Sequence, residues 1–284
     1  MRWAWWAIVV CALAGAGGCL TRAARPTAES VARSLAPVVP VEGVYLESVI
    51  LERPLGDRFL NRDLWTDAVP VGSQETRTLL NENGLRAGVL SGSLPPRFQT
   101  LLESESESLG GRGLTFAMRK EEVLPTSGAS ERCEFGLLAD LAGKRAPVAL
   151  KQARAGVMVR PEAQGDRVKV YCEPQIQHGE KREWLRPSAD GTGFVKFEEV
   201  PLARYSVLGF DASLGRSEYL VIGWQADQPD TLGAALFAVE ANGQPRQRVL
   251  VVRARQTSPG PASDLPSLGP ARRPSIAAEA AKGR

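Results

Sequence analysis

Residues 205–255 contain four short apolar runs, which are Tyr205-Ser-Val-Leu-Gly-Phe210, Glu218-Tyr-Leu-Val-Ile222, Ala235-Leu-Phe-Ala-Val239 and Arg248-Val-Leu-Val-Val-Arg253. Turn-forming residues separate the runs. Asn242-Gly243 is a strong hairpin signal, because both residues tolerate the positive φ that a tight β turn requires. The last run is apolar on both faces of an extended strand, which predicts that it is covered on both sides. The four runs therefore predict a β meander around which the other segments pack.

The preceding segments extend this β pattern. Short runs of strand-forming residues, separated by Gly, Pro, Asp and Ser, are spaced as in a β-sandwich or a rolled sheet. In Arg167-Val-Lys-Val-Tyr-Cys172, alternation places Val168, Val170 and Cys172 on one face. Residues 110–256 are therefore predicted to form a mainly antiparallel β domain, whose earlier strands are expected at 112–118, 133–141, 155–160, 167–172 and 194–200.

Residues 43–109 mix strand and helix patterns. The alternation in residues 43–52 predicts a half-buried strand, and apolar residues at helical spacing predict helices over 57–69 and 73–84. Asn83-Gly84 is a typical helix C-cap. A return strand at 85–90 and a short helix at 95–102 complete a small α/β module, so the expected fold class is α+β.

The N-terminus resembles an export signal. Arg2 precedes the apolar run Trp3–Leu13, and small residues lead to Cys19 in Ala16-Gly-Gly-Cys19. This end resembles the lipobox of bacterial lipoproteins, which implies lipidation at Cys19 and attachment to the outer membrane, facing the periplasm. Cleavage after Ala16, which releases a soluble exported protein, and an uncleaved spanning helix are the two alternatives.

The segments flanking the expected domains have a composition typical of disorder. We expect a leader at 1–19, a flexible tether at 20–42 and a disordered tail rich in Pro, Ala and Ser at 257–284. The formal net charge of the 284 residues is only +3, and it is spread evenly. Nucleic acid is therefore not an expected partner, because such a surface needs clustered Lys and Arg.

Few residues suit catalysis or metal binding. His178 is the only histidine, and the chain has no Gly-x-Ser-x-Gly motif. Cys133 and Cys172 are too few for a zinc site beside one histidine. An exported location permits a disulfide between them, and two separate buried thiols are the alternative. No cofactor or metal is expected. Residues 81–88 lack the glycine spacing of a phosphate-binding loop.

Residues 148–255 resemble the late part of the secretin domain of bacterial secretion pores. The resemblance rests on the order of four motifs, which implies a secretin-like β domain in a secretion or outer-membrane assembly. The motifs are Arg167-Val-Lys-Val-Tyr-Cys-Glu-Pro-Gln-Ile176, Glu218-Tyr-Leu-Val-Ile-Gly-Trp224, Leu232-Gly-Ala-Ala-Leu-Phe237 and Gln247-Arg-Val-Leu-Val-Val-Arg253.

Two classes of function follow from these patterns. The first is a non-enzymatic, envelope-anchored module that the N-terminal lipid holds at the membrane and that binds a protein partner in the envelope; no small-molecule substrate is identified. The alternative is a secreted hydrolase with a carboxylate site, for example at Glu198-Glu199. Neighbouring residues on a strand face opposite sides, which makes these two carboxylates a poor catalytic pair.

Overall fold

The computed structural model of this chain describes residues 43–92, 94–104, 107–117, 120–188 and 191–257. The expected leader at 1–19, the tether at 20–42 and nearly all of the expected tail lie outside these residues. The expected class is confirmed, since the described residues form mainly antiparallel β-sheets with a few short helices.

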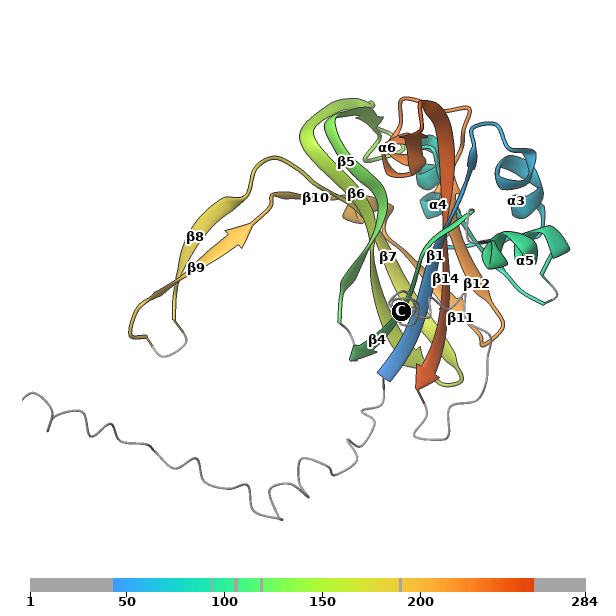
Figure 1. Ribbon diagram of the computed structural model, residues 1–284, viewed down its shortest axis with the longest axis horizontal. Coiled ribbons are helices and arrows are strands. Elements are labelled where there is room, and N and C mark those ends of the chain that lie inside the picture. The colour runs from blue at the N-terminus through green and yellow to red at the C-terminus, as the bar shows by residue number, and fades with distance from the viewer. Residues whose placement is uncertain (1–42, 93, 105–106, 118–119, 189–190, 258–284) are drawn as a thin grey trace, which may run out of the picture. The chain divides into compact units, whose positions relative to one another are not determined.

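The larger sheet has seven strands in the order β2-β3-β12-β14-β1-β4, with β13 also paired to β14. Figure 1 shows β1, β14 and β12 side by side. Every pairing in this sheet is antiparallel. The strands are β1 (Gly43–Pro54), β2 (Val69–Pro70), β3 (Leu85–Leu90), β4 (Ser108–Ala117), β12 (Tyr219–Trp224), β13 (Ala238–Ala241) and β14 (Gln244–Thr257).

The second sheet has five strands in the order β10-β7-β6-β5, and β11 also pairs with β7. Val168, Val170 and Cys172 of β7 are at most 1% exposed, which confirms the predicted alternation. The strands are β5 (Glu122–Leu137), β6 (Ala146–Gln164), β7 (Arg167–Gln177), β10 (Leu202–Arg204) and β11 (Phe210–Leu214). A third sheet consists of β8 (Arg182–Pro187) and β9 (Phe194–Glu199) alone.

The apolar core lies on both faces of the larger sheet. Leu250 and Val252 of β14 belong to a cluster that includes side chains of the second sheet, such as Val170. Val249 and Val251 belong to a cluster on the opposite face, together with side chains of the helical segments. The prediction that this strand is covered on both sides is therefore confirmed.

Helical segments cover the face of the larger sheet that the second sheet leaves open. They are η1 (Phe59–Asp63), one turn of π-helix that continues into α3 (Leu64–Thr66), and α5 (Pro96–Glu103). Phe98 of α5 is fully buried in this layer. The Trp65 indole donates a hydrogen bond to the Leu60 carbonyl at 2.7 Å, five residues back, within the turn where the π-helix passes into α3.

Helix α4 (Gln74–Glu82) begins and ends as its sequence predicts. The Ser73 side chain accepts a hydrogen bond from the Thr76 amide at the N-terminus. At the C-terminus Gly84 has φ of +70°, a conformation that glycine adopts without steric cost. A Cβ at this position would clash with the Thr231 hydroxyl, so the close approach also requires glycine.

Two predicted strands are wrong in part. Of the expected strand Ala235–Val239, only Ala238 and Val239 are extended, in β13. Residues 232–237 form the helix α6 (Leu232–Phe237), because Leu232 and Leu236, four residues apart, bury the same helical face. Ser206–Leu208 is a turn of 3₁₀ helix, η2, and the following strand starts only at Phe210. In both places a short apolar run is too short to show a period.

The predicted Asn-Gly turn is confirmed. Asn242 and Gly243 have φ of 55° and 71°, and they connect β13 to β14 in an antiparallel hairpin. The boundary expected between residues 109 and 110 does not divide the strands into separate sheets. Strands β1 and β3, which precede it, pair with β14 and β12, which follow it. The described residues belong to one compact unit.

Candidate interaction surface

The hairpin of β8 and β9 is the candidate functional element. Its six cross-strand pairs run from Arg182 opposite Glu199 to Pro187 opposite Phe194. The connecting turn is held by the Ser188 amide, which donates to the Gly193 carbonyl, and by the Ser188 hydroxyl, which accepts from the Gly193 amide. The hairpin therefore has its own backbone pairing and turn.

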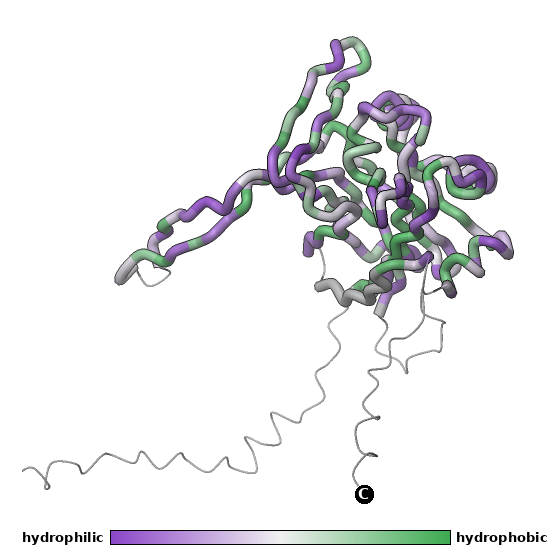
Figure 2. Tube along the Cα trace, turned by 45° about the horizontal axis from the view of Figure 1, so that its top comes forward, coloured by the Kyte–Doolittle hydropathy of each residue, from purple (hydrophilic) through white to green (hydrophobic). Residues whose placement is uncertain are grey.

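Large apolar side chains of this hairpin lie in solvent. Half of the exposed large apolar residues in the described part of the chain are in β8 and β9. The exposed fractions range from 44% for Phe197 to 72% for Phe194. Green apolar segments accordingly alternate with purple ones along the hairpin in Figure 2. Clustered exposed apolar residues mark interaction sites in soluble domains, whereas scattered ones do not.

Alternation sorts these side chains into two faces. Trp184 lies opposite Phe197, and Arg186 lies opposite Val195, so these four residues share one face. The Arg186 guanidinium stacks over the Phe197 ring, 5.1 Å from its centroid. We call this side the aromatic face, defined by Trp184, Arg186, Val195 and Phe197.

The opposite face carries most of the carboxylates of the hairpin, and they are neutralised there. Lys196 pairs with Glu183 at 2.5 Å, and Lys181 pairs with Glu198 at 3.3 Å. On the side of the aromatic face, Arg182 and Arg186 outnumber the single carboxylate of Glu199. The aromatic face is therefore apolar with an excess of positive charge.

The free energy available from covering this face is substantial. Aromatic side chains bury about 150–250 Å² each, and Trp184 and Phe197 are about half exposed. Removal of the exposed half of both rings from water contributes roughly 5 kcal/mol at about 25 cal/mol per Å². Trp and Arg are also the residues that most often dominate binding at protein interfaces.

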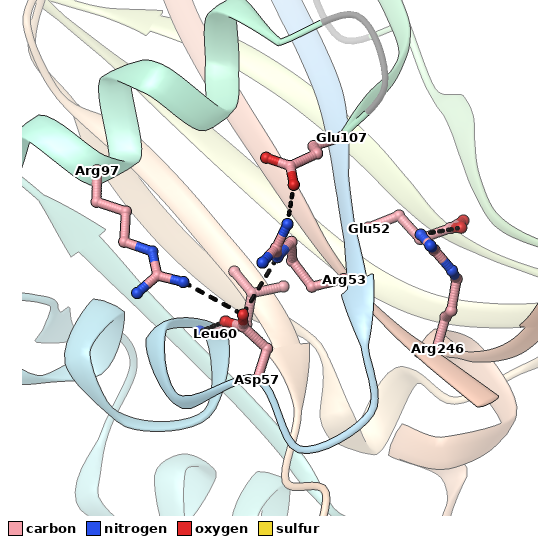
Figure 3. A network of polar contacts seen from close by, with 7 residues as sticks. All are labelled: Glu52, Arg53, Asp57, Leu60, Arg97, Glu107 and Arg246. Atoms are coloured by element: carbon pink, nitrogen blue, oxygen red, sulfur yellow. Dashed lines mark hydrogen bonds and ion pairs between the residues drawn. The ribbon is translucent and has the colours of Figure 1, made fainter. Parts of the chain in front are cut away.

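The ionic clusters in the body of the protein are structural. Figure 3 shows Asp57 accepting hydrogen bonds from Arg53, Arg97 and the Leu60 amide, while Arg53 also pairs with Glu107. These contacts connect β1, η1 and α5. Each carboxylate faces a guanidinium, so the cluster satisfies its charges internally.

Two further buried carboxylates are satisfied by arginines in the same way. Glu52 pairs with Arg246 and with Arg248, at 3.3 and 2.8 Å. Glu173 of β7 accepts hydrogen bonds from Arg204 at 2.6 Å and from the Tyr171 hydroxyl at 3.1 Å. Burial alone would raise the pKa of Glu173, but these hydrogen bonds outweigh it and lower the pKa. An ionised carboxylate of this kind fixes β10 against β7 and is poorly suited to donate a proton.

The disulfide between Cys133 and Cys172 is not formed, and both thiols are free. Cys133 lies opposite Leu150 and Cys172 opposite Val159, so β6 runs between them and their positions are far apart along it. Neighbouring strands are about 4.8 Å apart, and two such spacings separate β5 from β7. The two Cα atoms are therefore farther apart than the roughly 7 Å that a disulfide spans. Burial raises the pKa of both thiols.

The remaining sequence candidates do not converge on one site. Glu198 and Glu199 are exposed and lie opposite Glu183 and Arg182, on the two faces of the hairpin, as the alternation predicts. His178 is half-buried just after β7, and its amide donates to the Pro201 carbonyl. Within the described residues, no group of three or more His, Cys, Asp and Glu side chains is placed to hold a metal ion.

Cys19 lies outside the described residues. Among the described helices, none combines the length and apolar character that crossing a bilayer requires. Sequence reasoning missed Trp184 and Phe197. The alternation of apolar and charged residues in Arg182-Glu-Trp-Leu-Arg186 and Val195-Lys-Phe-Glu198, either side of a Gly-rich turn, was the available signal.

No family model, no curated protein and no solved structure matches this chain. The functional proposal is therefore based on the geometry of the described residues.

Proposed function

We propose that this protein is an exported, envelope-anchored lipoprotein that acts as a non-enzymatic interaction module. The hairpin β8–β9 is its contact element, and the occupant of the aromatic face is a protein with an apolar surface bordered by carboxylates. The observation that carries this proposal is the exposed aromatic face with its excess positive charge. The resemblance of residues 148–255 to secretins supports a partner in a secretion or outer-membrane assembly.

The chemistry of the face supports a protein partner of this kind. Exposed Trp and Phe side chains supply apolar area, and Arg186 supplies hydrogen-bond donors at the edge of the same surface. Because the opposite face has its carboxylates paired with lysines, the field of Arg182 and Arg186 is not cancelled across the hairpin. An acidic rim on the partner complements this field.

We expect photo-crosslinking in cells to distinguish the two faces. A photoreactive phenylalanine analogue at position 184 is expected to form a discrete adduct with one envelope protein, while the same analogue at position 185 forms none. Charge reversal by Arg186→Glu is expected to reduce the adduct at least about tenfold, because the complementary charge is lost. The readout is the mass and identity of the adduct.

The matched control is Lys144→Glu, a charge reversal at an exposed lysine outside the hairpin, which should leave the adduct unchanged. The Arg186 and Lys144 side chains are both exposed, so melting temperatures should stay within about 2 °C of the wild type. Equal adducts at positions 184 and 185, or no adduct at either, would contradict the proposal. A product with twice the mass of this chain would instead identify a second copy as the occupant.

Lipidation at Cys19 is proposed on the small-residue run that precedes it. Cells supplied with an alkyne-bearing fatty acid are expected to label the wild-type protein and not the Cys19→Ala variant. Equal labelling of the two proteins would contradict lipidation at Cys19, and a mature N-terminus at Gly17 would show that an ordinary signal peptidase processes the chain instead.

A further inference from the structure

A cavity of about 320 Å³ lies between helix α4, strand β3 and Trp65 of α3. This size falls at the lower end of the range for small-molecule sites, about 300–1,000 Å³. Ala68, Ala87 and Gly88 form part of the wall, and the two methyl groups and the absence of a side chain at Gly88 leave the space open. Five side chains bring hydrogen-bonding groups to the wall, and they are Gln74, Arg77, Thr78, Asn81 and Arg86.

The charge of this wall has one sign. Two guanidinium groups, those of Arg77 and Arg86, line it, and none of the lining side chains carries a carboxylate. Elsewhere in the described residues arginines such as Arg53, Arg204 and Arg248 contact carboxylates directly. The cavity therefore brings two arginines together with no carboxylate in its wall.

Arg86 is held in place by neutral groups. Its Nε and Nη2 donate to the Trp224 carbonyl at 3.3 and 3.0 Å, and its Nη1 donates to the Asn61 carbonyl at 2.7 Å. The guanidinium also stacks on the Trp65 ring, 4.5 Å from the centroid. A guanidinium has five N–H donors, so these contacts leave two of them for a ligand.

Burial leaves the Arg86 charge undercompensated. Desolvation lowers the pKa of Arg86 to about 10, and Asp227, which is exposed and outside the cavity wall, opposes this shift. A half-buried cation that donates only to neutral carbonyl oxygens does not recover the full free energy lost when its charge was removed from water. An anion in contact with it would offset this cost.

Arg77 brings the second cation from the adjacent helix. Its Nη2 donates to the Gln74 side chain at 3.0 Å, and its buried Nε has no hydrogen-bond partner among the described residues. Gln74 and Asn81 use their side-chain oxygens to accept hydrogen bonds from Arg77 and Gln225. Since the oxygens of these two side chains are already used as acceptors, their NH₂ groups are the parts that can donate hydrogen bonds to an anionic ligand.

We propose that this cavity binds the oxyanion of a small molecule, either a carboxylate or a phosphate group, between the guanidinium groups of Arg77 and Arg86. Guanidinium groups pair with both oxyanions through two parallel hydrogen bonds. The site uses side-chain cations and does not use a glycine-rich loop, so it agrees with the lack of phosphate-loop spacing in residues 81–88. It is independent of the aromatic face of the hairpin.

Calorimetric titration of the full-length protein, purified in detergent at low ionic strength, tests this site with two probes. Succinate represents a carboxylate and inorganic phosphate represents a phosphate group. At least one probe is expected to bind with a stoichiometry of one. Arg77→Met is expected to weaken that affinity at least about tenfold, because it removes the charge and the donors while keeping the length.

Two further variants separate ligand binding from general effects. Arg62→Met removes an exposed cation outside the cavity wall and should leave the affinity unchanged within about twofold. Arg77→Lys retains the charge but lacks the paired donors of a guanidinium, so its affinity should fall between those of Arg77→Met and the wild type, which distinguishes loss of charge from loss of fold. Binding of succinate alone or of phosphate alone identifies the ligand class. No saturable binding of either probe, or equal affinities of Arg77→Met and the wild type, would overturn the site.

Discussion

Replacement of Leu250 by alanine is expected to lower the free energy of unfolding by about 2–5 kcal/mol, one of the two largest effects we predict. The Leu250 side chain is 1% exposed and packs between the two sheets. Its neighbours across the strands are Ile222 on β12 and Ile50 on β1, so paired strands on both sides limit how far the site can collapse. Truncation therefore leaves a cavity, and the lost contacts are not replaced.

Thermal unfolding of Leu250→Ala measures this effect. A domain of this size is expected to lose about 2–4 °C of melting temperature per kcal/mol. The matched control is Leu185→Ala in the hairpin, where the same side chain is 69% exposed and its truncation should change stability by less than about 0.5 kcal/mol. Equal melting temperatures for Leu250→Ala and the control would contradict the packing of the two sheets around β14.

Replacement of Asn83 by alanine is expected to cost about 2–5 kcal/mol as well. The fully buried Asn83 amide donates to the Leu138 carbonyl and accepts from the Leu138 amide, both at 2.8 Å. It also donates to the Leu79 carbonyl at 2.9 Å, while its own backbone carbonyl accepts from the Gly233 amide. Alanine would leave the two backbone groups of Leu138 without partners, and each buried unsatisfied group costs about 1–3 kcal/mol.

Chemical denaturation of two further variants tests the origin of this loss. Asn81→Ala removes an exposed amide from the same helix end and should cost less than about 1 kcal/mol, since the hydrogen bond that its side chain accepts from Gln225 lies at the surface. Asn83→Asp keeps an acceptor for the Leu138 amide but brings a carboxylate against two carbonyl oxygens. It should therefore be at least as unstable as Asn83→Ala at neutral pH. A stable Asn83→Asp protein would show that the amide donor is not required.

Local patterns predicted the elements whose signals are complete within a few residues. The alternation of β7, the cap at Asn83-Gly84 and the turn at Asn242-Gly243 depend on side-chain period and on allowed φ values, and these properties belong to the residues themselves. Apolar residues on both faces of β14 likewise predicted that both faces are covered, because exposing either apolar face to water is unfavourable.

The predictions failed where a short apolar run carried no period. Residues 232–237 form a helix because the hydrogen bond from the Gly233 amide to the Asn83 carbonyl and the burial of Leu232 and Leu236 favour a turn there. Nothing within six residues distinguishes this from a strand. The candidate surface was missed for a related reason, since the exposure of Trp184 depends on what the rest of the chain leaves uncovered.

The sequence by itself determined the α+β class, the strand-rich second half, the turn chemistry and the cap of α4. Tertiary structure alone decided that Gly43 of β1 lies opposite Thr257 of β14, that Asn83 reaches Leu138, and that Arg77 and Arg86 line one cavity. The physical reason is that pairing and burial between distant segments depend on which faces remain available after every other segment has packed. That outcome is a property of the whole chain, whereas propensity and periodicity are properties of a few neighbouring residues.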